Sequence, residues 1–295
     1  MSIRRFVDAH VHLWKLDHLR YPWLTGPFDA NGPNGSVEPI AHDYLPDDYR
    51  KDAAGYNVVK AVHIDAGAHP DDAIGETRWL QNLADHDGFP SAIVAYAALN
   101  DLNLDAHLAE YVQSPNVRGI RHILNWHPDP ARTYTPKNLF DDPQLATGYA
   151  LLAKHNLSFD LQIYPNQMQA AYQLAKNQDD IPLILNHMGM PVDADRTQWR
   201  AGMQALAQLP QAAVKISGFG FFDRQWTTES VRPLVLDVIA WFGADRVLFA
   251  SDFPTDKLFN SYGRALDAYD AITQDFTTSE RDNMFGQNAE RIYRI

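Results

Sequence analysis

The sequence predicts an α/β fold, a single (β/α)8 TIM barrel that spans residues 1–295. The length of 295 residues fits one barrel of roughly 250 residues with added loops. Eight short apolar runs recur along the chain, and segments with helical spacing lie between them. Eight alternating units favour a closed barrel over an open doubly wound sheet.

The apolar runs are the expected strands. Stretches such as Val-Val-Lys-Ala-Val-His-Ile are almost continuously apolar, which is typical of parallel strands covered on both faces. The eight runs are Phe6–Val11, Val58–Asp65, Ala92–Leu99, Val117–Leu124, Leu157–Tyr164, Pro182–His187, Ala213–Ser217 and Arg246–Ser251.

Between the runs, apolar residues at helical spacing predict helices. The clearest cover Asp71–Asp87, Leu145–His155 and Ser230–Phe242. Pro233 falls in the first turn of the third, where proline is tolerated. A last helix is expected to start at Thr278.

Three insertions interrupt this rhythm, at residues 21–46, 125–141 and 218–228. They follow the first, fourth and seventh runs, so they leave the C-terminal ends of strands, where barrel active sites lie. Their Trp, Phe and Tyr content favours loops that cover a ligand over plain surface insertions. The candidate pocket walls, each with core packing as its alternative, are Trp14, Trp126, Phe221, Phe222 and Trp226.

The composition disfavours several classes of function. A formal net charge of -12 gives a surface that repels nucleic acid and anionic membranes, so neither partner is expected. Cysteine is absent, which excludes disulfides, cysteine nucleophiles and Cys–metal ligation. No secretory signal is recognisable, and no apolar run approaches the length of about 18 residues that predicts a membrane span. A cytoplasmic protein is therefore expected, while the oligomeric state is not indicated.

His10 and His12, within the stretch Val-Asp-Ala-His-Val-His-Leu-Trp of residues 7–14, are the strongest local signal. Side chains two apart in a strand point to the same side, so both imidazoles would project inward. There they could ligate a metal or donate hydrogen bonds to one substrate oxygen. His187 ends the sixth run, and Asp252 lies at the end of the eighth. Singly, His187 fits a structural histidine and Asp252 a helix N-cap, but four such groups at strand ends favour a catalytic site.

Other strand ends supply candidates for substrate binding. Arg121 could bind a substrate carboxylate or hydroxyl through its planar guanidinium, or form a salt bridge at the barrel rim. Gln162 and Tyr164 share a face of the fifth run with Asp160, which is expected to lie deeper, and Arg224 is a second basic candidate. The substrate-binding set is Arg121, His122, Gln162, Tyr164, His63 and Trp14.

Seven stretches, in order along almost the whole chain, carry a resemblance to a known family. They are Asp-Ala-His-Val-His-Leu-Trp (8–14), Tyr-Leu-Pro (44–46), Gly-Ile-Arg-His (119–122), Leu-Asn-His-Met-Gly-Met-Pro (185–191), Val-Lys-Ile-Ser-Gly (214–218), Ala-Ser-Asp-Phe-Pro (250–254) and Asn-Ala (288–289). The sequence resembles the amidohydrolase superfamily, in its amidohydrolase-2 branch of sugar-acid lactonases, 2-pyrone-4,6-dicarboxylate lactonases and related metal-dependent hydrolases. The resemblance implies a TIM barrel with His10, His12, His187 and Asp252 in the site. It also implies that Asp252 is the base that activates water, while the histidines orient or polarise the scissile carbonyl.

Two ligands that the resemblance leads one to expect are missing. Two-metal members of the superfamily usually carry a bridging Lys on the fourth strand and a His on the fifth, but residues 118–124 contain no Lys and residues 158–164 no His. A bridged two-metal centre is therefore not expected. The expected cofactor is one divalent ion, zinc foremost, held by His10, His12, His187 and Asp252, and a site that works without metal stays open.

The residues and the resemblance together predict a hydrolase that opens a lactone ring, from a sugar acid or from aromatic catabolism. Asp252 would activate water for attack on a carbonyl polarised by histidine or metal. The alternative is a metal-dependent decarboxylase of an aromatic or enoic acid on the same scaffold, and a non-catalytic binding barrel is a third class. Gln162, Tyr164 and the aromatic loops favour a neutral sugar lactone as the small-molecule partner, although the sequence does not identify one substrate.

Overall fold

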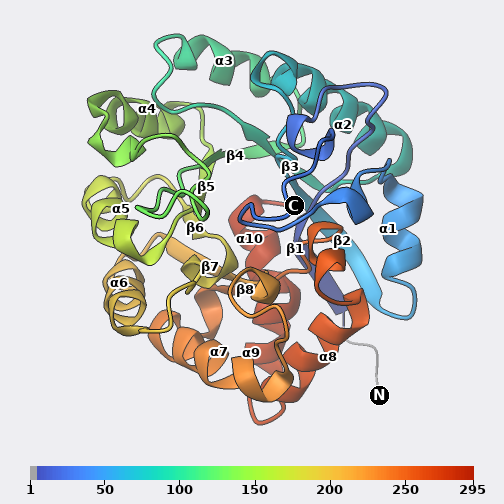
Figure 1. Ribbon diagram of the computed structural model, residues 1–295, viewed down its shortest axis with the longest axis vertical. Helices are drawn as coiled ribbons and strands as arrows, with labels where there is room; N and C mark the ends of the chain where they lie inside the picture. Colours follow the sequence, from blue (N-terminus) through green and yellow to red (C-terminus); the bar gives the residue numbers. More distant parts are fainter. Residues whose placement is uncertain (1–4) are drawn as a thin grey trace.

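A computed structural model describes residues 5–295, which form the expected (β/α)8 barrel (Figure 1). The strands pair in parallel, each with the next one along the chain. They are β1 (Arg5–Val11), β2 (Asn57–Ile64), β3 (Ala92–Tyr96), β4 (Val117–Ile123), β5 (Ser158–Gln162), β6 (Leu183–Leu185), β7 (Ala212–Ile216) and β8 (Val247–Phe249). The fold class predicted from the sequence is confirmed.

The ring is joined between β1 and β8 by backbone hydrogen bonds just beyond the strand ends. The Asp252 N–H donates to the His10 carbonyl at 2.9 Å, and the His12 N–H donates to the Phe253 carbonyl at 2.8 Å. The seam of the barrel therefore runs directly through three of the residues that the sequence marks as catalytic.

Within residues 5–295, one helix lies in each connection between successive strands, and three more follow β8. They are α1 (Pro46–Asp52), α2 (Ala73–Asp87), α3 (Leu104–Tyr111), α4 (Pro143–Lys154), α5 (Met168–Ala175), α6 (Thr197–Ala207), α7 (Thr228–Phe242), α8 (Tyr262–Ile272), α9 (Thr278–Asp282) and α10 (Asn288–Tyr293). In Figure 1, α1 to α8 surround the strands and α10 lies in the middle. The helices expected at 71–87, 145–155, 230–242 and from 278 correspond to α2, α4, α7 and α9.

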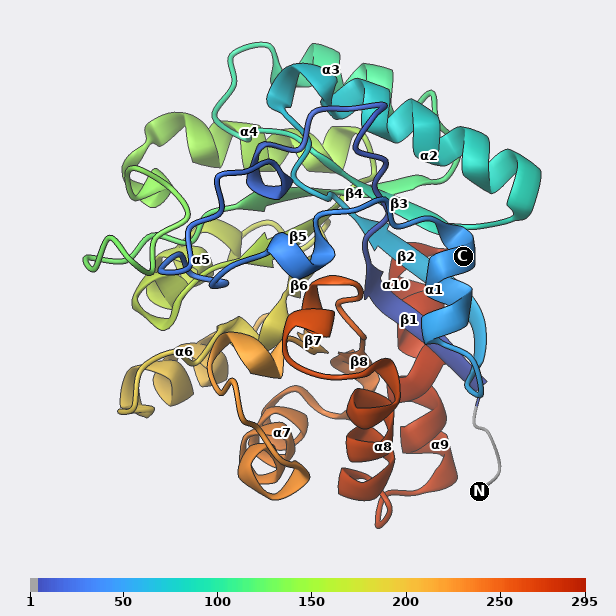
Figure 2. The same cartoon turned by 45° about the vertical axis from the view of Figure 1, so that its right-hand side comes forward.

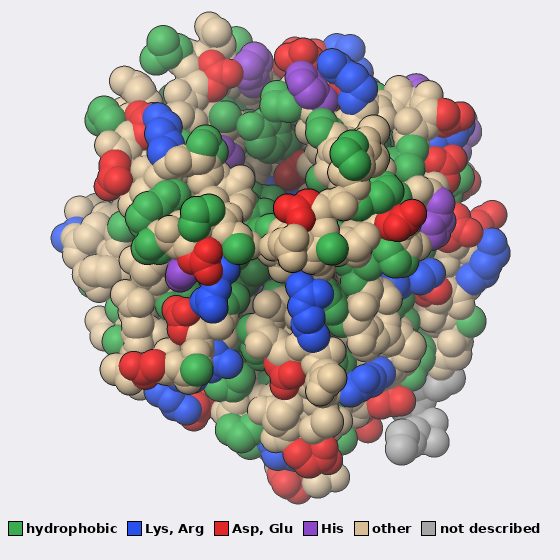
Figure 3. Space-filling view, viewed as in Figure 1, with side chains coloured by type: hydrophobic (Ala, Val, Ile, Leu, Met, Phe, Trp, Pro, Cys, Tyr) green, Lys and Arg blue, Asp and Glu red, His purple; other side chains and the backbone are tan. Residues whose placement is uncertain are grey.

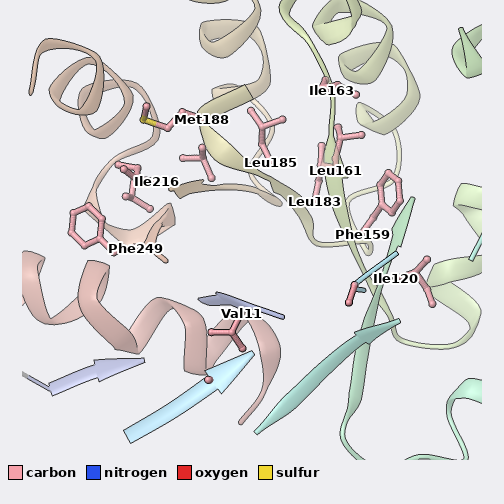
Figure 4. Close-up of a cluster of buried hydrophobic side chains, with 14 of the residues drawn as sticks. Val11, Ile120, Phe159, Leu161, Ile163, Leu183, Leu185, Met188, Ile216 and Phe249 are labelled. Atoms are coloured by element: carbon pink, nitrogen blue, oxygen red, sulfur yellow. The ribbon is translucent and has the colours of Figure 1, made fainter. Parts of the chain in front are cut away.

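Strand alternation divides the core into an inner and an outer layer. Val62 and Ile64 of β2 belong to the inner cluster, to which α10 contributes Tyr293. Ala61 of the same strand belongs to the outer cluster, between the barrel and the surrounding helices. Glu290 of α10 pairs with Arg5 at the start of β1, so α10 closes the N-terminal end of the barrel. The outer cluster in Figure 4 includes Ile120, Phe159, Leu161, Leu183, Leu185, Ile216 and Phe249.

Seven of the eight strands end one to three residues before the end of the apolar run that predicts them. The run beyond β5 contains Ile163 and the run beyond β8 contains Ala250, and both residues are fully buried although they lie outside the strands. Apolar composition continues past the strand because the turns at this end of the barrel are themselves covered. The apolar runs therefore predict buried residues correctly but overestimate the length of the strands.

The three expected insertions lie at the C-terminal ends of the strands. Segment 21–46 passes over these ends in both views (Figures 1 and 2). Figure 3 shows the same face, which is hollowed between side chains that are largely hydrophobic. The insertions include the first residues of α1 and α7 and a single bridge from Tyr44 to Trp14. Their other regular structure, among residues 5–295, is four short 3-10 turns at Pro22–Leu24, Glu38–Ile40, Leu139–Asp141 and Phe219–Phe221.

Among residues 5–295, no helix combines the length and the apolarity that crossing a bilayer requires.

Candidate active site

The four residues that the sequence marks as catalytic meet at the C-terminal mouth of the barrel. Nε2 of His10 lies 3.2 Å from Nε2 of His12, and each of these atoms lies 3.3 Å from Oδ1 of Asp252. Nε2 of His187 lies 3.9 Å from the same oxygen. All four side chains are buried. The structure thus brings together side chains that are separated by up to 242 positions in the chain.

A bulge in β1 aims the first two histidines. Asp8 is opposite Ala61 of β2 but Val11 is opposite His63, so β1 holds one more residue than β2 over this stretch. Such an extra residue breaks the two-residue alternation and re-aims a side chain. Asp8 accordingly contacts Tyr49 and Tyr262 outside the strand wall, whereas His10 faces His12 and Asp252.

His187 and Asp252 both follow a strand in the left-handed backbone conformation, with φ of 50° and 59°. Residues other than glycine adopt this region at a cost of about 1–3 kcal/mol, and they do so mainly where the surroundings enforce it. Nδ1 of His187 lies 2.9 Å from the Ser217 hydroxyl, which fixes the ring plane. The two turns therefore present one imidazole, after β6, and one carboxylate, after β8, at fixed positions at the mouth of the barrel.

Burial keeps the three imidazoles neutral. It lowers the pKa of His12 to about 3, with the Arg121 charge acting in the same direction. It also lowers the pKa values of His10 and His187 well below the usual value. Neutral imidazoles can offer a nitrogen lone pair or an N–H group, as a metal site or a polarised carbonyl requires.

Burial acts on Asp252 in the opposite sense and raises its carboxyl pKa well above the usual value. The positive charges of Arg121 and Lys215 oppose that shift. Oδ2 of Asp252 has no hydrogen-bond partner among residues 5–295. One carboxylate oxygen thus faces the histidines, while the other is left without a hydrogen-bond partner among the described residues.

The donor set of His10, His12 and Asp252 fits a divalent metal ion. The Nδ1–H of His12 donates to the Ile64 carbonyl at 2.7 Å, which leaves the Nε2 lone pair of the neutral ring directed at the other two groups. Donor atoms around a tetrahedral zinc with bonds of about 2.0–2.1 Å lie about 3.3 Å apart, which matches the observed triangle. His187 does not join this group. Three of the four ligands expected from the sequence therefore come together.

A cavity of about 220 Å³ adjoins this group. Five of the predicted site residues line it, and so does Phe221, one of the expected aromatic walls. The sequence did not single out Trp23, Asn34, Tyr134 and Thr255. Three of these four lie in the insertions that predict a covered pocket, and Thr255 follows Asp252 by three residues. The full lining is His12, Trp23, Asn34, Ala66, Gly67, Arg121, Ile123, Tyr134, Gln162, His187, Phe221, Asp252 and Thr255.

Arg121 is held in the pocket wall by Asp65. Its Nε donates to Oδ2 of Asp65 at 3.3 Å, and its Nη2 donates to the Asp65 carbonyl at 2.5 Å. The remaining terminal nitrogen, Nη1, lies 3.5 Å from Oε1 of Gln162. Asp65 thus balances the charge of the guanidinium, and the second N–H groups of Nη1 and Nη2, which have no acceptor among residues 5–295, stay available to a ligand.

Two histidines of the expected substrate-binding set lie outside the cavity lining because of strand alternation. His63 shares the outer face of β2 with Ala61, and its Nδ1 accepts a hydrogen bond from the Leu13 N–H at 3.1 Å. His122 follows Arg121 on β4 and so faces the other way, where Nδ1 accepts from the Leu99 N–H at 3.2 Å. Their contact with a substrate therefore stays a prediction.

Trp14 and Tyr164 also lie behind the lining residues. The indole N–H of Trp14 donates to the His42 carbonyl at 2.7 Å. The Tyr164 hydroxyl donates to the Arg132 carbonyl at 2.5 Å, since β5 ends at Gln162 and its alternation does not extend to this residue. Three more of the expected aromatic walls lie outside the lining, namely Trp126, Phe222 and Trp226.

Asp160 lies deeper than Gln162, as expected from the sequence. It pairs with Lys215 of β7, whose Nζ is 2.5 Å from Oδ1, and it accepts a hydrogen bond from the Tyr293 hydroxyl at 2.9 Å. All three side chains are fully buried. This cluster links the barrel interior to α10, beneath the pocket.

The chain has relatives along its full length. An amidohydrolase family model matches residues 7–295. The uncharacterized protein y4mH of Sinorhizobium fredii is 44% identical over 300 residues, covering 100% of both chains. An L-fucono-1,5-lactonase of Burkholderia ambifaria is 27% identical over 302 residues, covering 98% of this chain and 95% of the lactonase. A crystal structure of an amidohydrolase of Burkholderia multivorans with bound zinc is 25% identical with a TM-score of 0.81, covering 99% of this chain and 100% of that one.

Proposed function

Because this chain belongs to the amidohydrolase family, we propose that it hydrolyses the lactone of a neutral sugar acid. The observation that carries the proposal is the placement of Asp252. Its Oδ1 faces His10 and His12, its Oδ2 has no hydrogen-bond partner among the described residues, and Asp252 lines the cavity. A buried base of this kind beside neutral imidazoles suits activation of water more than passive binding.

The proposed reaction begins at the lactone carbonyl. Oδ2 of Asp252 accepts a proton from a water molecule as the water oxygen attacks the carbonyl carbon. The Ser217 hydroxyl can donate to Nδ1 of His187, which leaves the Nε2–H of that ring to donate to the developing oxyanion. Asp252 then returns the proton to the ring oxygen as its bond to the acyl carbon breaks. The product is the open hydroxy acid.

A divalent ion, where bound, would be held by His10, His12 and Asp252 and would polarise the scissile carbonyl as a Lewis acid. The two nitrogen donors and one oxygen donor suit zinc, as does the bound zinc of the relative from Burkholderia multivorans. The residues keep their roles in either case. His187 stays outside the triangle as a hydrogen-bond donor, and Oδ2 of Asp252 stays the proton acceptor.

A neutral substrate is favoured by the charge balance of the pocket. Arg121 is the basic group of the lining, and Asp65 compensates it. Arg224, the second basic candidate from the sequence, lies instead over the Phe259 ring and outside the lining. Asn34, Gln162 and Tyr134 offer neutral hydrogen-bonding groups, and Trp23 and Phe221 offer apolar surface. These features suit a polyhydroxylated ring, such as the sugar lactone named for the Burkholderia ambifaria relative.

The test is a panel of sugar and aromatic lactones with acid release followed at constant pH, run with and without a chelator. We expect turnover to be fastest with a six-membered sugar lactone. Hydroxybenzoate-like acids are included in the same panel, with CO2 release as the measured signal. Release of CO2 without turnover of any lactone would assign the decarboxylase alternative instead and overturn the proposal.

A further inference from the structure

Asp8 is a fully buried carboxylate that lies outside the cavity lining and has no part in the proposed reaction. It accepts four hydrogen bonds. Oδ1 accepts from the Ser251 N–H at 2.9 Å and from the His10 N–H at 3.3 Å. Oδ2 accepts from the hydroxyls of Tyr49 at 2.8 Å and Tyr262 at 3.1 Å. The two oxygens therefore serve different neighbours, one the backbone at the seam and the other the helices α1 and α8.

The two backbone groups bound by Oδ1 belong to the catalytic group or adjoin it. His10 is itself one of the buried histidines, and Ser251 immediately precedes Asp252. The bulge in β1 shifts the register of the β1–β2 pair at this point, and the Asp8 carboxylate serves as an acceptor for both N–H groups. Buried N–H groups without an acceptor are costly, and a carboxylate is a stronger acceptor than a carbonyl.

The same oxygen thus fixes both sides of the β1–β8 seam. On one side it holds the bulge that turns His10 inward. On the other side it holds the start of the turn in which Asp252 takes its left-handed conformation. The next hydrogen bonds along the seam, from the Asp252 N–H to the His10 carbonyl and from the His12 N–H to the Phe253 carbonyl, continue this junction.

We propose that Asp8 is a positioning residue for the hydrolytic site, whose Oδ1 sets the separation between His10 and Asp252 across the seam. The inference rests on the proposed function, in which these two residues act on the same lactone. Oδ2 anchors the carboxylate to α1 and α8 and does not set the geometry of the site. The two roles can be separated because each oxygen has its own partners.

The experiment compares three variants that weaken or remove different parts of this network. Asp8→Asn keeps an oxygen toward the two N–H groups but replaces the carboxylate by a weaker, neutral acceptor, and its amide N–H can donate to the tyrosine hydroxyls. The matched control, Tyr49→Phe with Tyr262→Phe, removes both bonds to Oδ2 and leaves Asp8 intact. Asp8→Ala removes the whole network.

For Asp8→Asn, we expect kcat on the best lactone to fall about tenfold while KM changes less than about threefold. For Asp8→Ala, kcat should fall at least about 100-fold, the size of effect that misplacement by 1 Å can cause. The tyrosine double variant should unfold at a lower temperature yet keep kcat within about threefold of the wild type. Equal loss of kcat in the double variant and in Asp8→Asn would show an anchoring role alone and overturn the proposal.

Amide hydrogen exchange measures the order of the seam directly. It requires no substrate, and it can be carried out on Asp8→Asn even if Asp8→Ala does not fold. Peptides covering residues 6–14 and 248–256 should both exchange faster in Asp8→Asn and remain as in the wild type in the tyrosine double variant. Unchanged exchange in Asp8→Asn would overturn the proposal. If exchange follows the expected pattern but the wild type opens no lactone, the proposed function fails and the role of Asp8 at the seam stands.

Discussion

The Tyr134 hydroxyl donates a hydrogen bond of 2.6 Å to Oδ1 of Asn34, and this contact joins two of the three insertions beside the pocket. From the third insertion, Arg224 lies 3.5 Å from the Pro33 carbonyl. Gly35 follows with a left-handed φ of 71°, and an added Cβ there would meet the Arg224 guanidinium at 2.7 Å. The tip of segment 21–46 is therefore held by both of the other insertions.

We predict that Tyr134→Phe raises KM for the lactone, because the loop that presents Asn34 to the pocket loses its tether. A typical net hydrogen bond of about 0.5–1.5 kcal/mol corresponds to an increase of roughly 2- to 12-fold. The kcat value should stay within about twofold, since neither residue contacts the reacting carbonyl in the proposed reaction. Steady-state kinetics of this variant and of Tyr56→Phe, which loses a tyrosine–aspartate bond outside the pocket, make the comparison. Equal KM in both variants would refute the role of the tether.

A second prediction concerns Arg121, whose planar guanidinium makes two contacts to Asp65 at once. Lysine keeps the positive charge but cannot reproduce this fork. We expect Arg121→Lys to lower kcat/KM by about 10- to 100-fold with an unchanged far-UV spectrum. Retention of wild-type kcat/KM by Arg121→Lys would mean that only charge is needed at this position, and the substrate contact would have to be assigned elsewhere.

The ligand set can be tested by titrating metal-stripped protein with zinc in competition with a chromophoric chelator. His10→Ala and His12→Ala each remove one donor of the triangle, and we expect each to weaken zinc binding at least about 100-fold. His187→Asn should bind zinc within about threefold of the wild type, because His187 lies outside the triangle. An equal loss in His187→Asn would extend the set to four ligands, as the sequence alone suggests.

Glu76 makes the stability of the fold depend on pH. Burial, reinforced by the nearby charge of Asp65, raises the pKa of Glu76 to about 8, against 4.5 without that environment. Between these values the folded protein holds a proton that the unfolded chain has released. The contribution of Glu76 to stability is therefore complete below about pH 4.5 and declines as pH rises toward 8.

Glu76→Gln removes this titration while keeping the shape of the side chain. We predict that the stability of the variant, relative to the wild type, increases from pH 5 to pH 8 by up to about 1.4 kcal/mol per pH unit. Urea unfolding of both proteins at pH 5, 6.5 and 8 measures the difference, in which the other titrating groups cancel. A difference that is constant over this range would contradict the prediction.

The sequence was sufficient for the barrel and for the central group of the site. Eight apolar runs predict eight strands, and four polar residues at strand ends predict the cluster around Asp252. Both inferences depend on local patterns, because the order of strands in a parallel barrel follows the order of the chain. A residue that follows a predicted strand can therefore be assigned to the C-terminal mouth without knowledge of any contact.

What the sequence did not predict depends on register and on loop structure. In fully buried strands both faces are apolar, so composition does not reveal that Arg121 faces inward while His122 and His63 face outward. The bulge that separates Asp8 from His10 has no local sequence signal of its own. Asn34 and Tyr134 lie in insertions without periodicity, where the contacts of a side chain depend on distant segments. The insertions were predicted to cover a pocket, and Phe221 was predicted as part of its wall, but Trp23, Asn34 and Tyr134 were not.

The central claim is that Asp252 activates the water that opens a lactone ring, and turnover by Asp252→Asn tests it most directly. Asparagine tolerates the left-handed φ of 59° at this position, so the turn should persist. It cannot accept the proton, and we predict that kcat on the best lactone falls by about 10²–10⁴-fold, the usual contribution of a general base. The far-UV spectrum and the thermal unfolding temperature should remain close to those of the wild type. Near-complete turnover by a folded Asp252→Asn protein would contradict the account.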